Sequence, residues 1–178
     1  VIGTDVFDQF LQENNLESFA LQATDDVEIN RRFVEAKKFP REIIRKLKDY
    51  LEMIKEPLAV RSSSLLEDSQ YQPFAGVYET FMIPNSDKNI KIRLHELIDS
   101  IKRVYASTFY KAAKDYMKAT AYRLEEEKMA VIIQRMVGAQ RGERFYPDFA
   151  GVAKSYNFYP VPPQKATDGI VMLALGLG

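Results

Sequence analysis

"PLAVRSSSLLEDSQYQPFAGVYETF", residues 57–81, places an arginine and three serines at the end of a short apolar run and follows them with a small-residue turn. Residues 58–61 predict a short strand bounded by Pro57 and the serines. Residues 76–83 alternate apolar and polar side chains, which predicts a second, half-buried strand. We therefore expect this segment to fold as strand, turn and strand.

Arg61 and the serines at 62–64 form the first candidate site. An arginine fork can hold two phosphate oxygens, and the hydroxyls and free backbone N–H groups that follow it can complete an anion pocket. A structural alternative stays open, because Ser64 and Glu67 fit a helix capping box and Arg61 can pair with Glu67 or Asp68.

Gly76 and Thr80 lie just downstream and add to this candidate site. A glycine lets the backbone come close to a ligand, and Thr80 offers a hydroxyl from the adjoining strand. An ordinary hairpin explains the glycine as well. Because a cation and a small-residue loop commonly flank a bound phosphate, the two segments together favour an anion site.

Gln134 is a lone amide within the apolar run of residues 129–137. A buried amide without a partner costs about 1 to 3 kcal/mol, so we expect one. That partner is either the edge of a purine or a neighbouring backbone group.

The pattern of the remaining chain predicts an α+β fold, with a mixed or antiparallel sheet flanked by helices. Residues 89–120 are consistent with one long helix or with two abutting helices. The other expected elements are amphipathic helices at 5–15 and 40–55, a central strand at 129–137, hairpins and loops at 144–163, and a buried strand at 169–175.

The composition indicates a globular protein. Its 178 residues, with 46% hydrophobic content, suffice for one core or for two small lobes that share one. Lys plus Arg and Asp plus Glu each number 25, so the zero net charge gives no support to nucleic-acid binding, and any anion site must be local. Cysteine is absent and no apolar stretch approaches the roughly 20 residues of a membrane helix, so we expect a cytoplasmic protein without membrane or nucleic-acid partners.

The remaining polar features indicate ordinary surface. His95, the only histidine, lies on the charged side of its predicted helix without a partner for a catalytic triad or a metal site. The acidic run at 124–128 is expected to be a solvated turn, because consecutive carboxylates point in different directions. We predict no metal site within the chain. The start at Val1 and the apolar run before Gly178 suggest a piece of a larger protein.

Three stretches resemble the amino-terminal nucleotide-binding domain of the phosphoenolpyruvate synthase and pyruvate phosphate dikinase family. They are "VRSSSLLEDSQYQPFAGVYETF", "VYASTFYKAAKDYMKATAYR" and "MAVIIQRMV", and the closing "LALGLG" is similar to the family's Gly-Leu-Gly turn. The first is specific, because Arg-Ser-Ser, the Glu-Asp pair, Phe-Ala-Gly and Glu-Thr occur in the family's order and spacing. The likeness is strong over residues 57–137 and looser toward both ends.

The resemblance implies an ATP-grasp fold, in which ATP lies between two α+β lobes, and makes residues 1–178 a partial domain of a larger multidomain protein. In the family, ATP phosphorylates a histidine on a separate swivelling domain, and that histidine passes phosphate to pyruvate on a third domain. The implied cofactors are ATP and Mg²⁺, and the implied partners are these two domains. The segment by itself is expected to be inactive.

The resemblance also assigns residues position by position. Arg61 matches the phosphate-binding arginine, whose charge would offset that of the departing phosphoryl group. Gly76 and Thr80 match the loop over the phosphates. Gln134 matches the strand residue beside the adenine, and Met136 lies where the adjoining hinge contact falls.

The sequence departs from the family's pattern in several places. No glycine-lysine phosphate motif precedes Arg61, and the acidic and glutamine residues that hold magnesium would lie beyond Gly178. The usual "SGVAFT" hairpin is replaced by "AGVAKS" at 150–155. His95 lacks the Thr-Ser-His context of the phosphorylated histidine. Two alternatives remain: a related phosphotransferase with an antibiotic or glucan acceptor, and a non-catalytic interaction module that kept the fold.

Overall fold

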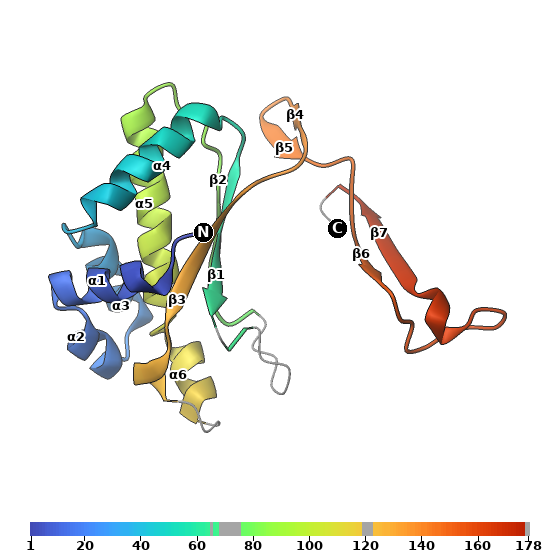
Figure 1. The fold of residues 1–178 in the computed structure, drawn as a ribbon, viewed down its shortest axis with the longest axis horizontal. Helices are drawn as coiled ribbons and strands as arrows, with labels where there is room; N and C mark the ends of the chain where they lie inside the picture. The colour runs from blue at the N-terminus through green and yellow to red at the C-terminus, as the bar shows by residue number, and fades with distance from the viewer. Residues whose placement is uncertain (65, 68–75, 119–122, 177–178) are drawn as a thin grey trace. The chain divides into compact units, whose positions relative to one another are not determined.

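The computed structural model describes residues 1–64, 66–67, 76–118 and 123–176. The chain divides into two compact units, Val1–Met136 and Val137–Gly178. The first unit contains a sheet with helices packed on it, and the second contains two hairpins (Figure 1). Helices combined with antiparallel sheets confirm the predicted α+β class.

The sheet of the first unit has three antiparallel strands in the order β2–β1–β3. β1 (Leu58–Ser64) lies in the middle, between β2 (Thr80–Ile83) and β3 (Met129–Arg135). Ile2 forms an isolated bridge to Val131 on β3, through two backbone hydrogen bonds of 2.8 and 3.0 Å. Segments that are far apart in the sequence therefore meet around β1.

These strands differ from the prediction at their ends and in their order. β1 continues to Ser64 instead of ending at Arg61, so the serines belong to the strand. β2 begins only at Thr80, so residues 76–79 of the predicted strand lie before it, and Gly76 among them has a positive φ of 81°. The predicted central strand at 129–137 is β3, which ends at residue 135 and lies beside the central strand rather than being it.

The helices of the first unit confirm the predicted helices at 5–15 and 40–55, which are α1 and α4. The region 89–120 holds two helices, α5 and α6, and the short helices α2 and α3 were not predicted. The bounds are α1 Thr4–Asn14, α2 Glu17–Gln22, α3 Asp26–Glu35, α4 Arg41–Met53, α5 Ile90–Ser107 and α6 Lys111–Lys118, with a short 3₁₀ helix, η1, at Leu124–Glu126. Of the helices in the described ranges, none is long and apolar enough to cross a membrane.

The core of the first unit is aromatic and lies between the helices and one face of the sheet (Figure 1). α5 packs against α3, α4 and the three strands. Its Tyr105 is fully buried, with ring centroids 5.1 Å from Phe7 and 5.6 Å from Phe10. Phe33, Phe39 and Phe109 complete the cluster. Burial of these large rings favours folding of the unit and gives the sheet a rigid support.

Cationic side chains from α5 and α6 reach the carboxyl ends of three other helices. Lys114 Nζ donates to the last carbonyls of α2, and Lys102 Nζ donates to Val34 and Ala36 at the end of α3, at 2.9 Å each. Arg93 Nη1 donates to Leu51 and Ile54 at the end of α4, at 3.0 and 3.3 Å. Each cation satisfies carbonyls that a helix end leaves without an internal partner and complements the helix dipole.

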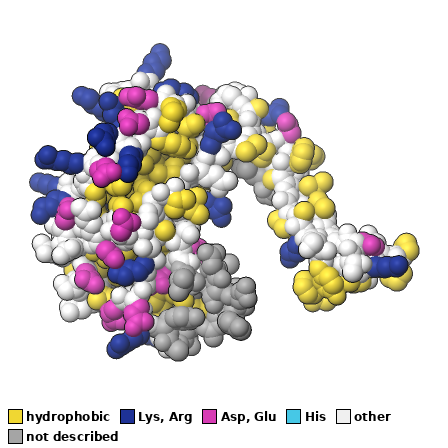
Figure 2. Space-filling model, in the orientation of Figure 1, with side chains coloured by type: hydrophobic (Ala, Val, Ile, Leu, Met, Phe, Trp, Pro, Cys, Tyr) yellow, Lys and Arg dark blue, Asp and Glu magenta, His cyan; other side chains and the backbone are white. Residues whose placement is uncertain are grey.

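The second unit consists of the hairpins β4–β5 and β6–β7. Its strands are β4 Ala139–Arg141, β5 Arg144–Tyr146, β6 Phe149–Lys154 and β7 Ile170–Leu175, with a 3₁₀ helix, η2, at Ala166–Asp168. The strand predicted at 169–175 is present as β7, but its expected burial is wrong, because most of its apolar side chains are exposed, Leu175 by 90%. Figure 2 shows hydrophobic side chains along this unit. A two-stranded sheet is too small to bury both of its faces.

Candidate functional site

The two faces of the β2–β1–β3 sheet differ in what covers them. Leu58 and Val60 are completely buried and belong to the core cluster that the helices share. Arg61 has the opposite orientation, because side chains alternate along a strand, and it is exposed. We call this second side the open face; it carries Ala59, Arg61, Ser63, Thr80, Met82, Ala130, Ile132 and Gln134.

Three of the predicted site residues come together on the open face. Arg61 lies directly opposite Thr80 on β2, and on its other side it is opposite Ile132 on β3. Gln134 is the diagonal neighbour, and Arg61 Nη1 donates to its Oε1 at 3.5 Å. Within the described ranges Arg61 has no carboxylate partner, so its charge is available to an anion.

Gln134 differs from the prediction in its surroundings. It is exposed on β3 rather than buried in an apolar strand, so the expected cost of a buried, unpaired amide does not arise. Its amide oxygen accepts from the Arg61 guanidinium, which is neither of the two partners that were expected. The contact joins the candidate phosphate ligand to the candidate adenine ligand.

Gly76 and Met136 lie beyond the strand ends. Gly76 is exposed, with a φ of 81°, and precedes Thr80 by four residues, which places its Cα within roughly 14 Å of the Thr80 Cα. Met136 continues the register of β3, since its backbone N–H donates to the carbonyl of Pro57 at 2.9 Å. The rest of the small-residue turn, residues 68–75, lies outside the described residues.

The serines after Arg61 do not act as one group. Ser62 and Ser64 alternate with Arg61 along β1, so they face away from the open face, and their hydroxyls form hydrogen bonds with Glu67. Ser62 Oγ donates to Glu67 Oε1 at 3.0 Å, and the Glu67 N–H donates to Ser64 Oγ at 3.4 Å. The expectation that all three hydroxyls complete an anion pocket is therefore wrong, because only Ser63 shares the face of Arg61.

The structural alternative for these residues is also only partly correct. The hydrogen bond between the Glu67 N–H and Ser64 Oγ has the form of a capping box, but Ser64 ends a strand, and residues 66–67 form a turn. The Glu67 carboxylate accepts from Ser62 rather than from Arg61. Asp68, the other expected partner of Arg61, lies outside the described residues.

Sequence reasoning missed two residues of the open face, namely Met82 and Ile132. Ile132 is half-buried, whereas Met82 is 64% exposed beside Thr80. The signal that could have found them is the alternation of the strands, counted outward from Arg61. Together they give the open face an apolar surface next to its cation.

A buried polar cluster lies beside the strand ends. Tyr78 Oη donates to Glu127 Oε1 at 2.9 Å, and both residues are buried, with 6% and 8% of their surface exposed. Burial raises the pKa of Glu127, whereas hydrogen bonds from Ser64 and Tyr78 oppose the rise. The expectation that residues 124–128 form a solvated turn is therefore wrong at Glu127, although Glu125 and Glu126 are exposed.

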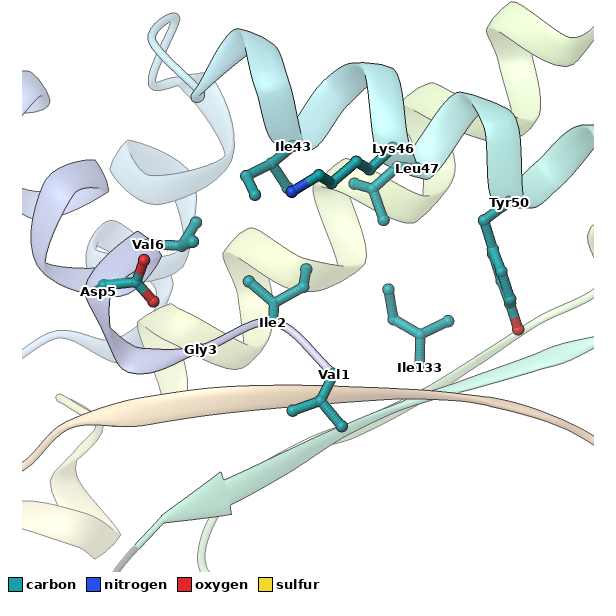
Figure 3. A pocket seen from close by; sticks show the side chains of 10 residues that line it. All are labelled: Val1, Ile2, Gly3, Asp5, Val6, Ile43, Lys46, Leu47, Tyr50 and Ile133. Carbon is teal, nitrogen blue, oxygen red and sulfur yellow. The ribbon is translucent and has the colours of Figure 1, made fainter.

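A cavity of about 360 Å³ lies elsewhere, between the amino-terminal segment, α4 and β3 (Figure 3). Its lining residues are Val1, Ile2, Gly3, Asp5, Val6, Ile43, Lys46, Leu47, Tyr50 and Ile133. Ile133 alternates with Gln134 along β3, so the cavity opens on the helix side of the sheet. It is separate from the open face.

The described residues contain no group of three or more histidine or carboxylate side chains that could hold a metal ion. His95 is exposed on α5, as predicted for a surface residue, and its Nε2 lies 3.4 Å from Asp99 Oδ2. These features leave the cation and polar side chains of the open face as the candidate site.

Comparison with protein families gives one match that covers the chain. The model of the family described as "Pyruvate phosphate dikinase, AMP/ATP-binding domain" matches residues 1–178. The match therefore includes both units and the five predicted site residues.

Curated relatives point in the same direction. The chain is 31% identical over 152 residues to phosphoenolpyruvate synthase of Deinococcus radiodurans, which covers 78% of the chain and 19% of that protein. It is 26% identical over 196 residues to a probable phosphoenolpyruvate synthase of Archaeoglobus fulgidus, covering 100% of the chain and 24% of the relative. An uncharacterized phosphotransferase of Bacillus subtilis is 27% identical over 143 residues, or 79% of the chain and 16% of the relative. The chain spans about a quarter or less of these relatives.

Proposed function

Because the chain belongs to the pyruvate phosphate dikinase AMP/ATP-binding domain family, we propose that the open face of the β2–β1–β3 sheet binds ATP through the guanidinium of Arg61. The observation that carries this proposal is the exposed cation on a sheet face, next to the Thr80 hydroxyl and without a carboxylate partner in the described ranges. A planar guanidinium in this setting can donate two hydrogen bonds to a phosphate group.

The other predicted residues take complementary roles in this proposal. The Thr80 hydroxyl donates to a phosphate oxygen, and the backbone at Gly76 approaches the phosphates without a side chain in the way. Gln134 and Met136 lie toward the adenine, and the exposed Met82 and half-buried Ile132 add apolar contact. The 178 residues then form part of an ATP-grasp nucleotide-binding domain.

For the whole protein, we propose the reaction of a phosphoenolpyruvate synthase in the cytoplasm. ATP phosphorylates a histidine on a separate swivelling domain, and the phosphate passes to pyruvate on a third domain. The names of relatives from Deinococcus radiodurans and Archaeoglobus fulgidus support pyruvate as the acceptor. This chain contributes binding and charge neutralisation rather than a nucleophile, and it is inactive by itself.

Magnesium is expected to accompany ATP, but the open face does not fit the ion. Mg²⁺ prefers carboxylate and water oxygens, and none of the residues that define the open face is a carboxylate. We therefore assign no magnesium ligand to the described residues of this chain.

The test is a titration of the 178-residue chain with ATP, followed by calorimetry, for the wild type and for Arg61→Ala. We expect weak binding by the wild type and an affinity at least about tenfold lower in the variant, because a charge-assisted hydrogen bond is lost.

Arg135→Ala is the matched control. Arg135 is an exposed arginine on the neighbouring strand, but it alternates away from the open face, and its Nη1 lies 3.3 Å from Glu56 Oε1. The control should keep wild-type affinity. Equal affinity of both variants and the wild type, or equal losses in both, would refute the assignment of Arg61.

A further inference from the structure

We propose that Tyr78 and Glu127 are positioning residues for the nucleotide site: their hydrogen bond fixes the backbone between Gly76 and Thr80 and so holds the phosphate-facing groups beside Arg61. The inference rests on the proposed function for its ligand. Neither side chain lies on the open face, so both act through the backbone that they hold.

The position of Tyr78 in the chain is the first argument. It lies two residues after Gly76 and two residues before Thr80, in the bend that precedes β2. Its buried hydroxyl donates to Glu127, which lies two residues before β3. One hydrogen bond therefore joins the entry of β2 to the entry of β3, the two strands that flank Arg61.

Neighbouring contacts hold the same region. Glu79 N–H donates to Ser107 Oγ at 3.2 Å, and that hydroxyl donates to the Val104 carbonyl at 2.7 Å, which ties the bend to the end of α5. Glu67, which precedes residues 68–75, is hydrogen-bonded to Ser62 and Ser64. The described residues before and after residues 68–75 are thus both anchored by hydrogen bonds on the helix side of the sheet.

The arrangement costs more than stability alone requires. A carboxylate at 8% exposure is expensive to bury, and a second carboxylate, Glu67, lies near enough to raise the Glu127 pKa further. An apolar contact would join the strands without that cost. A directional hydrogen bond instead fixes where the backbone runs, which is what phosphate recognition needs.

The test uses Tyr78→Phe, which removes the hydroxyl and keeps the ring. Tyr105→Phe is the matched control, since the Tyr105 hydroxyl is buried and has no hydrogen-bond partner among the described residues. Affinities for ATP and for adenosine are measured on the full chain. We expect Tyr78→Phe to weaken ATP binding roughly three- to tenfold and to leave adenosine binding unchanged, whereas the control alters neither.

Glu127→Gln gives the rescue, because its amide oxygen still accepts from Tyr78. We expect its ATP affinity to lie within about twofold of the wild type. The inference is overturned if Tyr78→Phe keeps wild-type ATP affinity, if it weakens ATP and adenosine equally, or if Glu127→Gln loses as much as Tyr78→Phe.

A ligand-free measurement separates this inference from the proposed function. Amide hydrogen exchange in a peptide covering residues 76–83 should be faster in Tyr78→Phe than in the wild type and in Tyr105→Phe. Unchanged exchange in Tyr78→Phe overturns the inference even if ATP binds. Failure of the wild type to bind ATP, with faster exchange in Tyr78→Phe, overturns the proposed function and leaves the anchoring role standing.

Discussion

Arg61 and Gln134 illustrate how strand register, rather than sequence distance, builds the candidate site. They are 73 residues apart, yet their side chains touch because β1 and β3 pair with Ala59 opposite Gln134. The same alternation turns Ser62 and Ser64 away from Arg61. A shift of the register by one residue would reverse these orientations and remove the site.

The side chains that form the candidate site could be predicted from the sequence only in part. The residue types and order of the 57–81 stretch favour an anion site around Arg61, and the structure has Arg61 exposed. The end of β1 was not predictable, because serine is common in turns and its role in this strand depends on Glu67 and Glu127. Burial of Glu127 likewise depends on Tyr78, 49 residues away.

The raised pKa of Glu127 predicts a pH dependence of stability. Burial, the largest cause, favours the protonated form, so the folded protein holds a proton that the unfolded chain releases near the ordinary value of 4.5. The contribution is complete below that value and is lost as the pH rises through the raised pKa. The free energy of unfolding of the wild type, minus that of Glu127→Gln, should therefore fall with rising pH above 4.5.

Urea unfolding of both proteins at a series of pH values gives this difference directly. Glu127→Gln supplies its own control, because every other titratable group is shared by the two proteins. A difference that stays constant, or that grows with pH, would contradict the account of Glu127.

Three helices of the first unit depend on hydrogen bonds that other helices donate to their carboxyl ends. α2, α3 and α4 each end at carbonyls that receive a cation from α5 or α6. Desolvation lowers the pKa of Lys102 and of Lys114. The lowered pKa values reflect the free-energy cost of burying these ammonium groups among helix ends. α5 therefore acts as a scaffold for the helices as well as a cover for the sheet.

This dependence also explains which helices the sequence predicted. α1 and α4 carry regular apolar stripes, and both were expected from their periodicity. α2 has only six residues, and a helix of that length is not stable by itself, so its local pattern is weak. Asp25 is the N-cap of α3, and its side chain accepts from the Val27 N–H, a sequence signal that could have predicted this helix.

Arg93 allows the scaffold role to be tested. Its Nη1 donates to Leu51, Ile54 and the Asn85 side chain, and it is almost completely buried. We expect Arg93→Met, which keeps the length of the stem, to lower the free energy of unfolding by about 3 kcal/mol, because buried acceptors lose a charged donor.

Chemical denaturation measures this loss, with Lys91→Met as the control. Lys91 is exposed on the same helix, and its replacement should change stability by less than about 0.5 kcal/mol. Similar effects of the two substitutions would show that Arg93 is not the clamp at the end of α4.

At the scale of the whole molecule, the two units contribute differently. The buried hydrophobic residues of the described chain lie in Val1–Met136, which also carries the open face. The second unit has two hairpins, and the apolar side chains of its strand β7, which the sequence pattern predicted to be buried, are mostly exposed. Hydrophobic periodicity reports what a strand can bury, whereas actual burial depends on the layers packed against it.

The central claim is that ATP binds on the open face beside Arg61, and methyl NMR of the methionine-labelled chain tests it most directly. Met82 lies on that face and is 64% exposed, whereas Met53, 74% exposed on α4, and the buried Met117 are internal controls. Titration with ATP should shift the Met82 methyl signal in the wild type, not in Arg61→Ala, and leave Met53 and Met117 unchanged. A Met82 signal that does not move at saturating ATP, or that moves equally in Arg61→Ala, would contradict the account.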